Sequence, residues 1–215
     1  MTSVLADEIM LATQLAQKLE ELIVKRGAFP PIRSDRDLLL IAYWSLMCEY
    51  NKGILSLVQD RFYAPAFALL RPIVETVVRC HVAKFGSDEE VNRLQNDQYS
   101  ISYEKDGARI DQALGTGELL DSYLKGVRPL LHSFTHSGKA QLARRFSGND
   151  IESSFNQNEV VALIAACSST LFMVTVLITR HFDFNEEWRA AQAIWNQYGN
   201  RSAYPSIDSD AGRPG

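Results

Sequence analysis

The amino-acid sequence predicts an all-α fold, most simply a bundle of about six to eight helices. Apolar residues recur every three to four positions along most of the chain, which is the spacing of one helix face. Capping residues, glycine and proline separate these periodic stretches, as is typical of helix ends. No stretch combines β-branched residues with strict alternation and flanking turn residues, so we expect no sheet.

Residues 3–25 and 34–59 form the first two predicted helices. Their apolar residues follow helical spacing, and the polar residues lie between them. Ser34 can cap the second helix, and Asp37 in its first turn can bond back to the capping residue, as in a capping box.

The third predicted helix contains Pro72 within its apolar pattern. Because proline cannot donate a helical hydrogen bond, we expect a kink near Ala68. Ser87 and Glu90 then form a second capping box, which begins a more polar helix. Residues 95–118 fit either a polar helix or a long irregular excursion.

A long apolar helix is predicted near residues 157–182, begun by Asn156 and Glu159. Residues 160–179 carry no charged side chain, and this length can span a bilayer. Small and polar residues dilute the stretch, and a thin polar stripe runs along it. We therefore predict the buried central helix of a bundle rather than a membrane span. The stripe consists of Ser168, Thr175 and Thr179.

We expect residues 1–198 to form a single helical domain and residues 199–215 to be a disordered tail rich in Pro, Gly, Ser and Asp. The formal net charge of −4 argues against coating nucleic acid by charge alone. The N-terminus lacks the pattern of a signal peptide, and the three cysteines lie within apolar helical runs. A cytoplasmic location, no membrane and no cofactor are therefore expected.

A short predicted helix near residues 128–138 carries a row of polar residues. Arg128, His132 and His136 follow i, i+4, i+8 spacing and share one side of the helix. The other side is apolar and should pack against the bundle. This apolar side consists of Val127, Leu130, Leu131 and Phe134.

This polar row has the groups needed for RNA cleavage without a metal. An imidazole near neutrality can take or give a proton, and a guanidinium can neutralise a phosphate. Arg144 and Arg145 could attract the substrate. The alternative is that the row is simply the solvent-exposed face of an amphipathic helix.

A metal site is a second functional interpretation of the same segment. His132 and His136 have the i, i+4 spacing with which one helix can supply two metal ligands. His81, Glu75 or Asp111 could complete such a site, although nothing in the sequence singles out one of them.

A second polar row consists of Arg71, Glu75 and Arg79 on the third predicted helix. Its simplest interpretation is a ladder of ion pairs along that helix. In the alternative, Glu75 orients a histidine across the bundle while Arg71 faces a phosphate.

Two segments resemble a group of bacterial all-helical proteins. Residues 66–75 carry A-x-x-L-x-R-P-x-x-E, and residues 131–138 carry H-x-x-x-H-[ST]-G. Their arrangement resembles the HEPN superfamily (higher eukaryote and prokaryote nucleotide-binding domain), whose members are helical bundles and often homodimers. Many are ribonucleases of toxin–antitoxin or phage-defence systems. The nuclease motif of that superfamily is Arg, four to six residues, then His, whereas here three residues separate Arg128 from His132 and seven separate it from His136.

The resemblance implies a dimeric protein that acts on RNA or a nucleotide. Arg128 would bind phosphate, and His132 and His136 would be the general base and acid. Arg71 and Glu75 would support the site. The rival interpretation is a non-enzymatic helical interaction module that binds an antitoxin or a defence-system partner.

Overall fold

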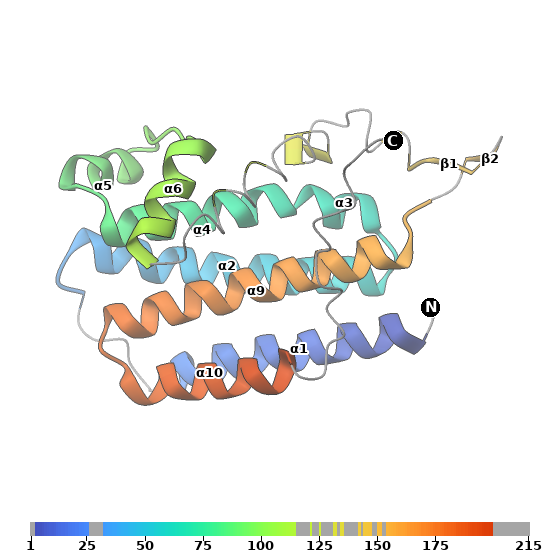
Figure 1. Ribbon diagram of the computed structural model, residues 1–215, viewed down its shortest axis with the longest axis horizontal. Coiled ribbons are helices and arrows are strands. Elements are labelled where there is room, and N and C mark those ends of the chain that lie inside the picture. Colours follow the sequence, from blue (N-terminus) through green and yellow to red (C-terminus); the bar gives the residue numbers. More distant parts are fainter. Residues whose placement is uncertain are drawn as a thin grey trace.

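The structure is a computed structural model that describes residues 3–25, 32–114 and 154–199. The tail predicted for residues 199–215 lies outside the described residues from residue 200 onward. Within the described part, the chain is the all-α bundle that the sequence predicts (Figure 1). Between residues 121 and 151 the structure also describes Asp121, Lys125, Leu131, His132, Phe134, Thr135, Leu142, 144–147, Asp150 and Ile151.

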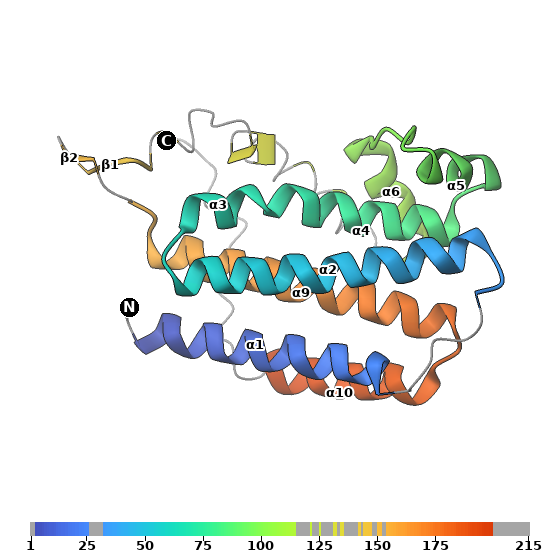
Figure 2. The ribbon, with the colours of Figure 1, turned by 180° about the vertical axis from the view of Figure 1, so that it is seen from behind.

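The long helices form three layers (Figures 1 and 2). The middle layer holds α2 (Asp35–Gln59) and α9 (Gln157–His181), which pack side by side. Two outer layers cover it on opposite sides, which leaves α9 in contact with helices of all three layers. The outer layers are α3 (Tyr63–Ala68) with α4 (Leu70–Phe85), and α1 (Ser3–Val24) with α10 (Asn185–Gly199).

The prediction of a buried central helix is confirmed. Among the described residues, α9 is the one helix long and apolar enough to cross a membrane, and 56% of its apolar window is buried inside the bundle. It packs against α1, α2, α4 and α10. Its side chains at Ile164, Cys167, Val174 and Ile178 are fully buried.

The polar stripe of α9 is also buried, and Thr175 in the stripe and Cys167 beside it pair with α2 through neutral groups. Trp44 Nε1 donates to Thr175 Oγ1 at 3.3 Å, and Asn51 Nδ2 donates to Cys167 Sγ at 3.1 Å. All three cysteines are buried and unbridged, as predicted. Each of these bonds forms only when its donor on α2 and its acceptor on α9 lie at the same level along the bundle. The bonds therefore fix the register of α2 against α9.

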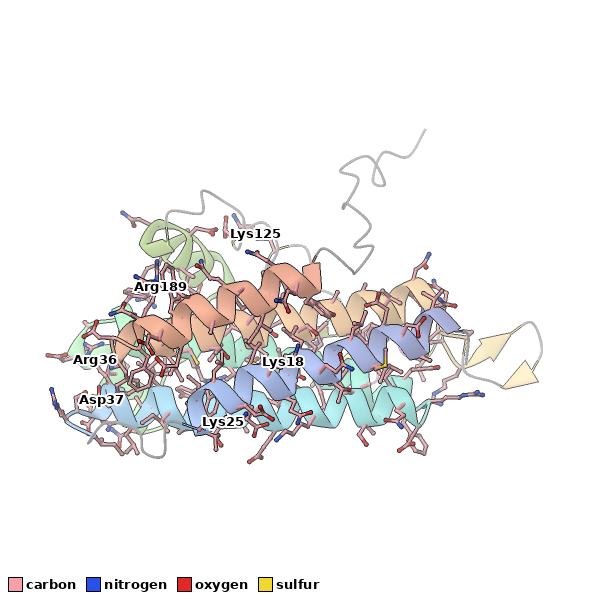
Figure 3. The ribbon with its side chains drawn as sticks, turned by 90° about the horizontal axis from the view of Figure 1, so that it is seen from below. Lys18, Lys25, Arg36, Asp37, Lys125 and Arg189 are labelled. Carbon is pink, nitrogen blue, oxygen red and sulfur yellow. The ribbon has the colours of Figure 1, made fainter. Side chains whose placement is uncertain are left out.

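Three helix starts follow the predicted capping chemistry, one of them with a difference. Complete capping boxes begin α5 at Ser87 and α9 at Asn156. At α2, Ser34 accepts from the Asp37 backbone N–H as predicted. The Asp37 carboxylate, however, does not close the box. It accepts from the Arg33 backbone N–H at 2.8 Å and pairs with His181 Nε2 at 2.7 Å, which joins the start of α2 to the end of α9. Figure 3 labels Asp37 at the start of α2.

The predicted interruption before Pro72 is present. Helix α3 ends at Ala68 and α4 begins at Leu70, with Leu69 in a turn between them. Proline therefore sits in the first turn of α4, where its missing N–H costs nothing.

Residues 95–118 form neither one polar helix nor a long excursion over their described part. Helix α5 (Asp88–Gln95) ends in a turn, and α6 (Tyr103–Leu114) follows after a short connection. Both pack on α4 at the end of the bundle (Figure 1). The turn contains Asp97 with φ of 55°, a left-handed conformation that lets the chain reverse between the two helices.

One small ladder departs from the expected absence of strands. Strand β1 (Phe146–Ser147) pairs antiparallel with β2 (Asp150–Ile151) in the stretch predicted to be a loop. Two residues per strand are too few for an alternating pattern to be visible in the sequence.

Candidate functional site

The best-defined charged cluster lies on α4, on the side that α6 covers. Glu75 Oε1 accepts from Arg71 Nε at 2.8 Å, and Glu75 Oε2 accepts from Arg79 Nη1 at 3.2 Å. Tyr103 of α6 adds a third bond by donating its hydroxyl to Glu75 Oε1 at 3.2 Å. The predicted ladder of ion pairs is therefore confirmed, and it is wider than predicted because a second helix joins it.

Partial burial makes this cluster more than a surface ion pair. The Glu75 side chain is 19% exposed, between arginines that are 32% and 26% exposed. Burial alone would raise the pKa of the Glu75 carboxyl, but the bonds from Arg71 and Arg79 outweigh it and lower the pKa. Glu75 therefore stays ionised near neutrality and is unsuited to donate a proton. Two arginines and one glutamate leave the cluster with one net positive charge.

Tyr103 ties α6 to this cluster. Burial, followed by the negative charge of Glu75, raises the pKa of the Tyr103 hydroxyl. The phenol consequently remains protonated and serves as a hydrogen-bond donor. No histidine is among the contacts described for Glu75, so the expected Glu–His pair is not seen in the described part of the chain.

A second charged network, which the sequence did not reveal, lies beside the first. Asp106 accepts from the Tyr99 hydroxyl at 2.7 Å and from Arg109 Nη2 at 3.1 Å. Arg109 also pairs with Glu90 of α5 at 2.5 Å. Burial, followed by the bond to Asp106, raises the pKa of Tyr99 to about 12. Asp106 and Arg109 have i, i+3 spacing on α6, but Glu90 lies on α5 and Tyr99 in the connection between the two helices, so helical spacing could not have revealed these two partners.

The histidine segment is described in part. Leu131 and Phe134 are buried and His132 is exposed, which agrees with the predicted division into an apolar and a polar side. Arg128 and His136 lie outside the described residues. The Phe134 ring stacks on Phe67 with centroids 4.9 Å apart. Phe67 lies four residues before Arg71. The histidine segment therefore packs just before the ladder of ion pairs formed by Arg71, Glu75 and Arg79, which is called the arginine ladder below.

A family model matches residues 44–200, which is well over half of the chain. The chain belongs to DUF6988, a family of unknown function. The match runs from the first half of α2 to the end of α10, and it includes both the arginine ladder and the histidine segment. No curated protein and no solved structure matches the chain.

The two arginines after the histidine segment differ in their surroundings in this DUF6988 chain. Arg144 is half-buried and pairs through Nη2 with Glu159, the residue that also completes the capping box of α9. Arg145 is exposed in the turn that leads into β1. Since Arg144 already holds the start of α9, Arg145 is the more available cation of the two.

The metal-site alternative gains no support from the described residues. His81 is buried, and its Nδ1 lies 2.8 Å from the Val77 carbonyl oxygen, to which it must donate. Asp111 is 1% exposed and accepts from the Asp121 backbone N–H at 2.8 Å. In the part of the chain that the structure describes, no three side chains of His, Cys, Asp and Glu form a group that could hold a metal ion.

Proposed function

We propose that this DUF6988 member is an HEPN-like protein that acts on RNA, as a metal-independent endoribonuclease of a toxin–antitoxin or phage-defence system. In this proposal it works in the cytoplasm as a homodimer. The observation that carries the proposal is the stacking of Phe134 on Phe67. The HEPN resemblance depends on segments 66–75 and 131–138. This contact joins the two segments, so the two motifs pack against each other in the fold.

The polarity of the histidine segment supports the same proposal. Its apolar side chains Leu131 and Phe134 are buried, and His132 is exposed. By helical spacing, Arg128 and His136 belong to the side of His132. In the proposal, these three groups together meet a phosphodiester from solvent.

The proposed reaction is a transfer of the phosphoryl group to the adjacent ribose oxygen. One imidazole takes the proton of the 2′-hydroxyl, and that oxygen attacks phosphorus. The bond to the 5′-oxygen breaks, and the second imidazole protonates this leaving oxygen. Arg128 neutralises the phosphate as charge develops, and the products are a 2′,3′-cyclic phosphate and a 5′-hydroxyl.

The arginine ladder has a supporting part in this proposal. Glu75 holds Arg71 and Arg79 in fixed positions, so these guanidinium groups need not move to meet a phosphate, while the neighbouring network of Asp106, Glu90 and Arg109 offsets the net charge. A fixed positive charge attracts a polyanion without having to reorganise. Arg145, which is exposed, would add to this attraction.

Cleavage of labelled RNA by the purified full-length chain in the presence of a chelator tests the proposal. We expect wild type to cut RNA, and His132→Ala and His136→Ala each to slow cutting by at least about 100-fold, the usual contribution of a general acid or base. Arg93→Ala is the control, because Arg93 is exposed on α5 and pairs only with Glu89 among its described contacts. Replacing the 2′-hydroxyl by hydrogen at the cut position should abolish cleavage there. Equal cutting by wild type and His136→Ala, or no cutting by wild type, contradicts the proposal and favours the non-enzymatic interaction module.

A further inference from the structure

An exposed aromatic side chain stands in the turn between α2 and α3. Phe62 is 59% exposed, whereas Tyr63 and Phe67, the aromatic residues that follow it on α3, are half-buried. A phenyl ring with more than half of its surface in water gives up much of the stabilisation that burial would bring. Packing within the bundle therefore accounts for only part of the position of this ring.

The residue before this ring has an uncommon backbone conformation. Arg61 has φ of 63°, in the left-handed region, at the end of α2. The turn is a Schellman motif, in which the Arg61 N–H donates to the Val58 carbonyl at 3.1 Å and the Phe62 N–H donates to the Leu57 carbonyl at 2.7 Å. Glycine is the usual residue at this position because it has no Cβ, so an arginine costs stability there. The Arg61 side chain is exposed and has no ion pair among the described residues, so nothing that the structure describes offsets that cost. At such positions function, rather than stability, commonly explains the residue.

A cluster of rings connects this turn to the histidine segment. The centroid of the Phe155 ring lies 5.9 Å from that of Tyr63 and 5.0 Å from that of Phe67. Phe67 in turn stacks on Phe134 of the histidine segment. Phe62 precedes Phe67 by five residues, or roughly 8 Å along a helix. Neighbouring nucleotides of one RNA strand could therefore reach both the exposed ring and the histidine segment.

A second exposed cation belongs to the same end of the bundle. The Ser154 N–H donates to the Arg144 carbonyl at 2.9 Å, which brings the turn that contains Arg145 next to the residue before Phe155. Figure 1 shows α3, the start of α9 and the β1–β2 ladder together at this end. Arg145 is exposed and, like Arg61, has no ion pair in the part of the chain that the structure describes. Both guanidinium groups are therefore available to pair with phosphate.

We propose that this turn is a binding subsite for single-stranded RNA, in which an unpaired base stacks on Phe62 while Arg61 and Arg145 pair with neighbouring phosphates. The inference rests on the function proposed above, and it adds the class of RNA that the site accepts. The exposed Asp60 precedes Arg61, so charge alone would hold a phosphate weakly there and stacking must supply part of the binding. Bases within a duplex keep their faces covered by their neighbours, so the subsite selects unpaired bases.

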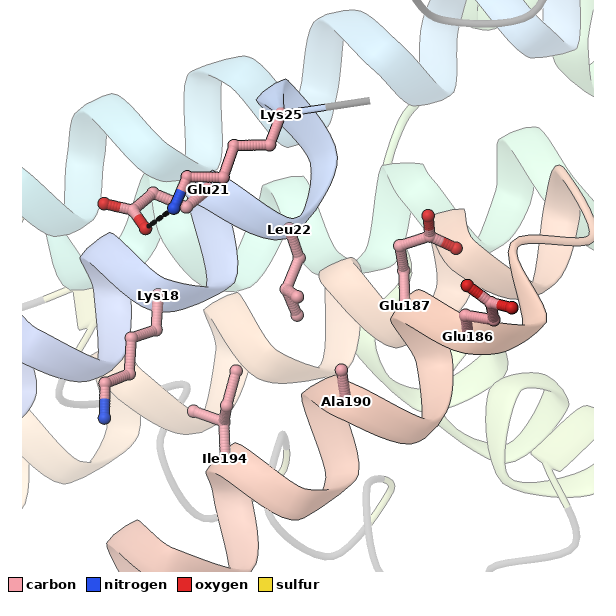
Figure 4. A pocket seen from close by; sticks show the side chains of 8 residues that line it. All are labelled: Lys18, Glu21, Leu22, Lys25, Glu186, Glu187, Ala190 and Ile194. Carbon is pink, nitrogen blue, oxygen red and sulfur yellow. Dashed lines mark hydrogen bonds and ion pairs between the residues drawn. The ribbon is translucent and has the colours of Figure 1, made fainter. Parts of the chain in front are cut away.

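The groove between α1 and α10 is less suitable for RNA (Figure 4). Its volume is about 430 Å³, and its two helices form the outer layer opposite to α3 and α4. Three glutamates and two lysines line this groove, so its charge does not favour a polyanion. The turn between α2 and α3 has the exposed ring and the two exposed arginines instead.

Fluorescence anisotropy with a fluorescein-labelled 2′-O-methyl RNA strand tests the proposal, because this strand lacks the 2′-hydroxyl and is not cut. We expect the full-length chain to bind the single strand about tenfold more tightly than the duplex of that strand with its complement. Phe62→Ala should weaken binding of the single strand by about tenfold, the usual contribution of one stacked base, and Phe62→Trp should preserve it. The matched control is Phe85→Ala, which removes a ring that is 43% exposed at the other end of α4 and should not change binding.

Arg61→Gly tells a binding role from a structural one. It should weaken binding of the single strand by about threefold and yet raise the urea midpoint of unfolding, since glycine suits the left-handed conformation. Arg93→Ala removes an exposed cation on α5 and should leave binding unchanged. Equal losses in Arg61→Gly and Arg93→Ala would assign binding to the general charge of the protein and overturn the proposal.

Three further outcomes overturn the subsite: no binding by wild type, equal binding of single strand and duplex, and unchanged binding by Phe62→Ala. Cutting is measured separately, so the two proposals fail in different ways. A chain that binds through Phe62 but cuts no RNA would lose the ribonuclease activity and keep the subsite. A chain that cuts RNA while Phe62→Ala binds like wild type would keep the activity and lose the subsite.

Discussion

Polar side chains in the middle of α9 pair through neutral hydrogen bonds, whereas those between α4 and α6 pair through charges. In the first region the partners are an indole, an amide, a thiol and hydroxyls, as in the bonds of Trp44 to Thr175 and of Asn51 to Cys167. In the second, one carboxylate joins Arg71, Arg79 and Tyr103. Both regions belong to the same bundle, and α4 takes part in both.

The neutral hydrogen bonds of α9 stabilise the fold, whereas the ion pairs between α4 and α6 can respond to salt and pH. Apolar burial and neutral hydrogen bonds hardly depend on salt, and they leave no net charge. Partly buried ion networks weaken as salt rises or as a partner titrates, and an unequal number of charges leaves a field outside the protein. The α4–α6 side is therefore the side whose stability should depend on salt and pH.

The largest expected effect comes from removing apolar volume next to α9. Ile178 is fully buried, and Ile178→Ala should lower the free energy of unfolding by about 2–5 kcal/mol through lost burial and a cavity. Ile32→Ala removes the same atoms at a position that is 55% exposed and should cost less than about 0.5 kcal/mol. Urea unfolding followed by circular dichroism measures both. Equal losses would mean that α9 is not the centre of the stabilising core.

Short-range rules predicted most of the fold. The capping boxes at Ser87 and Asn156, the interruption before Pro72 and the burial of α9 all depend on residues within a few positions of one another. For α9, the polar stripe indicated a core helix rather than a membrane span, and the structure supplies the reason: Thr175 has a partner, Trp44, on a neighbouring helix.

Long-range partners could not be predicted in the same way. Asp37 was expected to bond within its own helix start, yet it pairs with His181, which is 144 residues away. Tyr103 belonged to a stretch with no clear assignment, so its bond to Glu75 could not be foreseen. For the candidate site, the sequence predicted the arginine ladder and the outward position of His132, whereas Arg128 and His136 stay predictions because they lie outside the described residues.

The next largest effect concerns His81, a histidine inside the core. Burial lowers the pKa of His81 to about 4, so the folded protein keeps this imidazole neutral while the unfolded chain protonates it near its ordinary value of 6.5. The stability that follows is complete above about pH 6.5 and is lost as the pH falls toward 4, by up to about 3 kcal/mol. Unfolding free energies measured by urea across this range should decline on acidification.

Two variants assign that decline to His81. In His81→Leu the slope between pH 6.5 and 4 should be markedly smaller, whatever the stability of the variant at neutral pH. Ile178→Ala, which removes no titratable group, should leave the slope of wild type unchanged. The pKa of Glu75 is lowered, so its contribution is lost only below its ordinary value of 4.5, outside most of this window. An unchanged slope in His81→Leu would contradict the assignment.

The smallest effect belongs to the charged region. Glu75→Gln keeps the shape of the side chain but removes the charge between two partly buried arginines, so we expect a loss of about 1–2 kcal/mol in the free energy of unfolding at low salt. Glu89→Gln changes a carboxylate with the same i, i+4 relation to an arginine, but 77% exposed, and should cost less than about 0.5 kcal/mol.

Salt and hydrogen exchange then show where the loss in Glu75→Gln arises. Raising the salt concentration should reduce the gap between wild type and Glu75→Gln, because ions screen the attraction that the variant lacks. Amide hydrogen exchange should quicken in α6, which Tyr103 ties to Glu75, and stay slow in α9. If Glu75→Gln behaved like Glu89→Gln in all three respects, the cluster on α4 would be an ordinary surface pair.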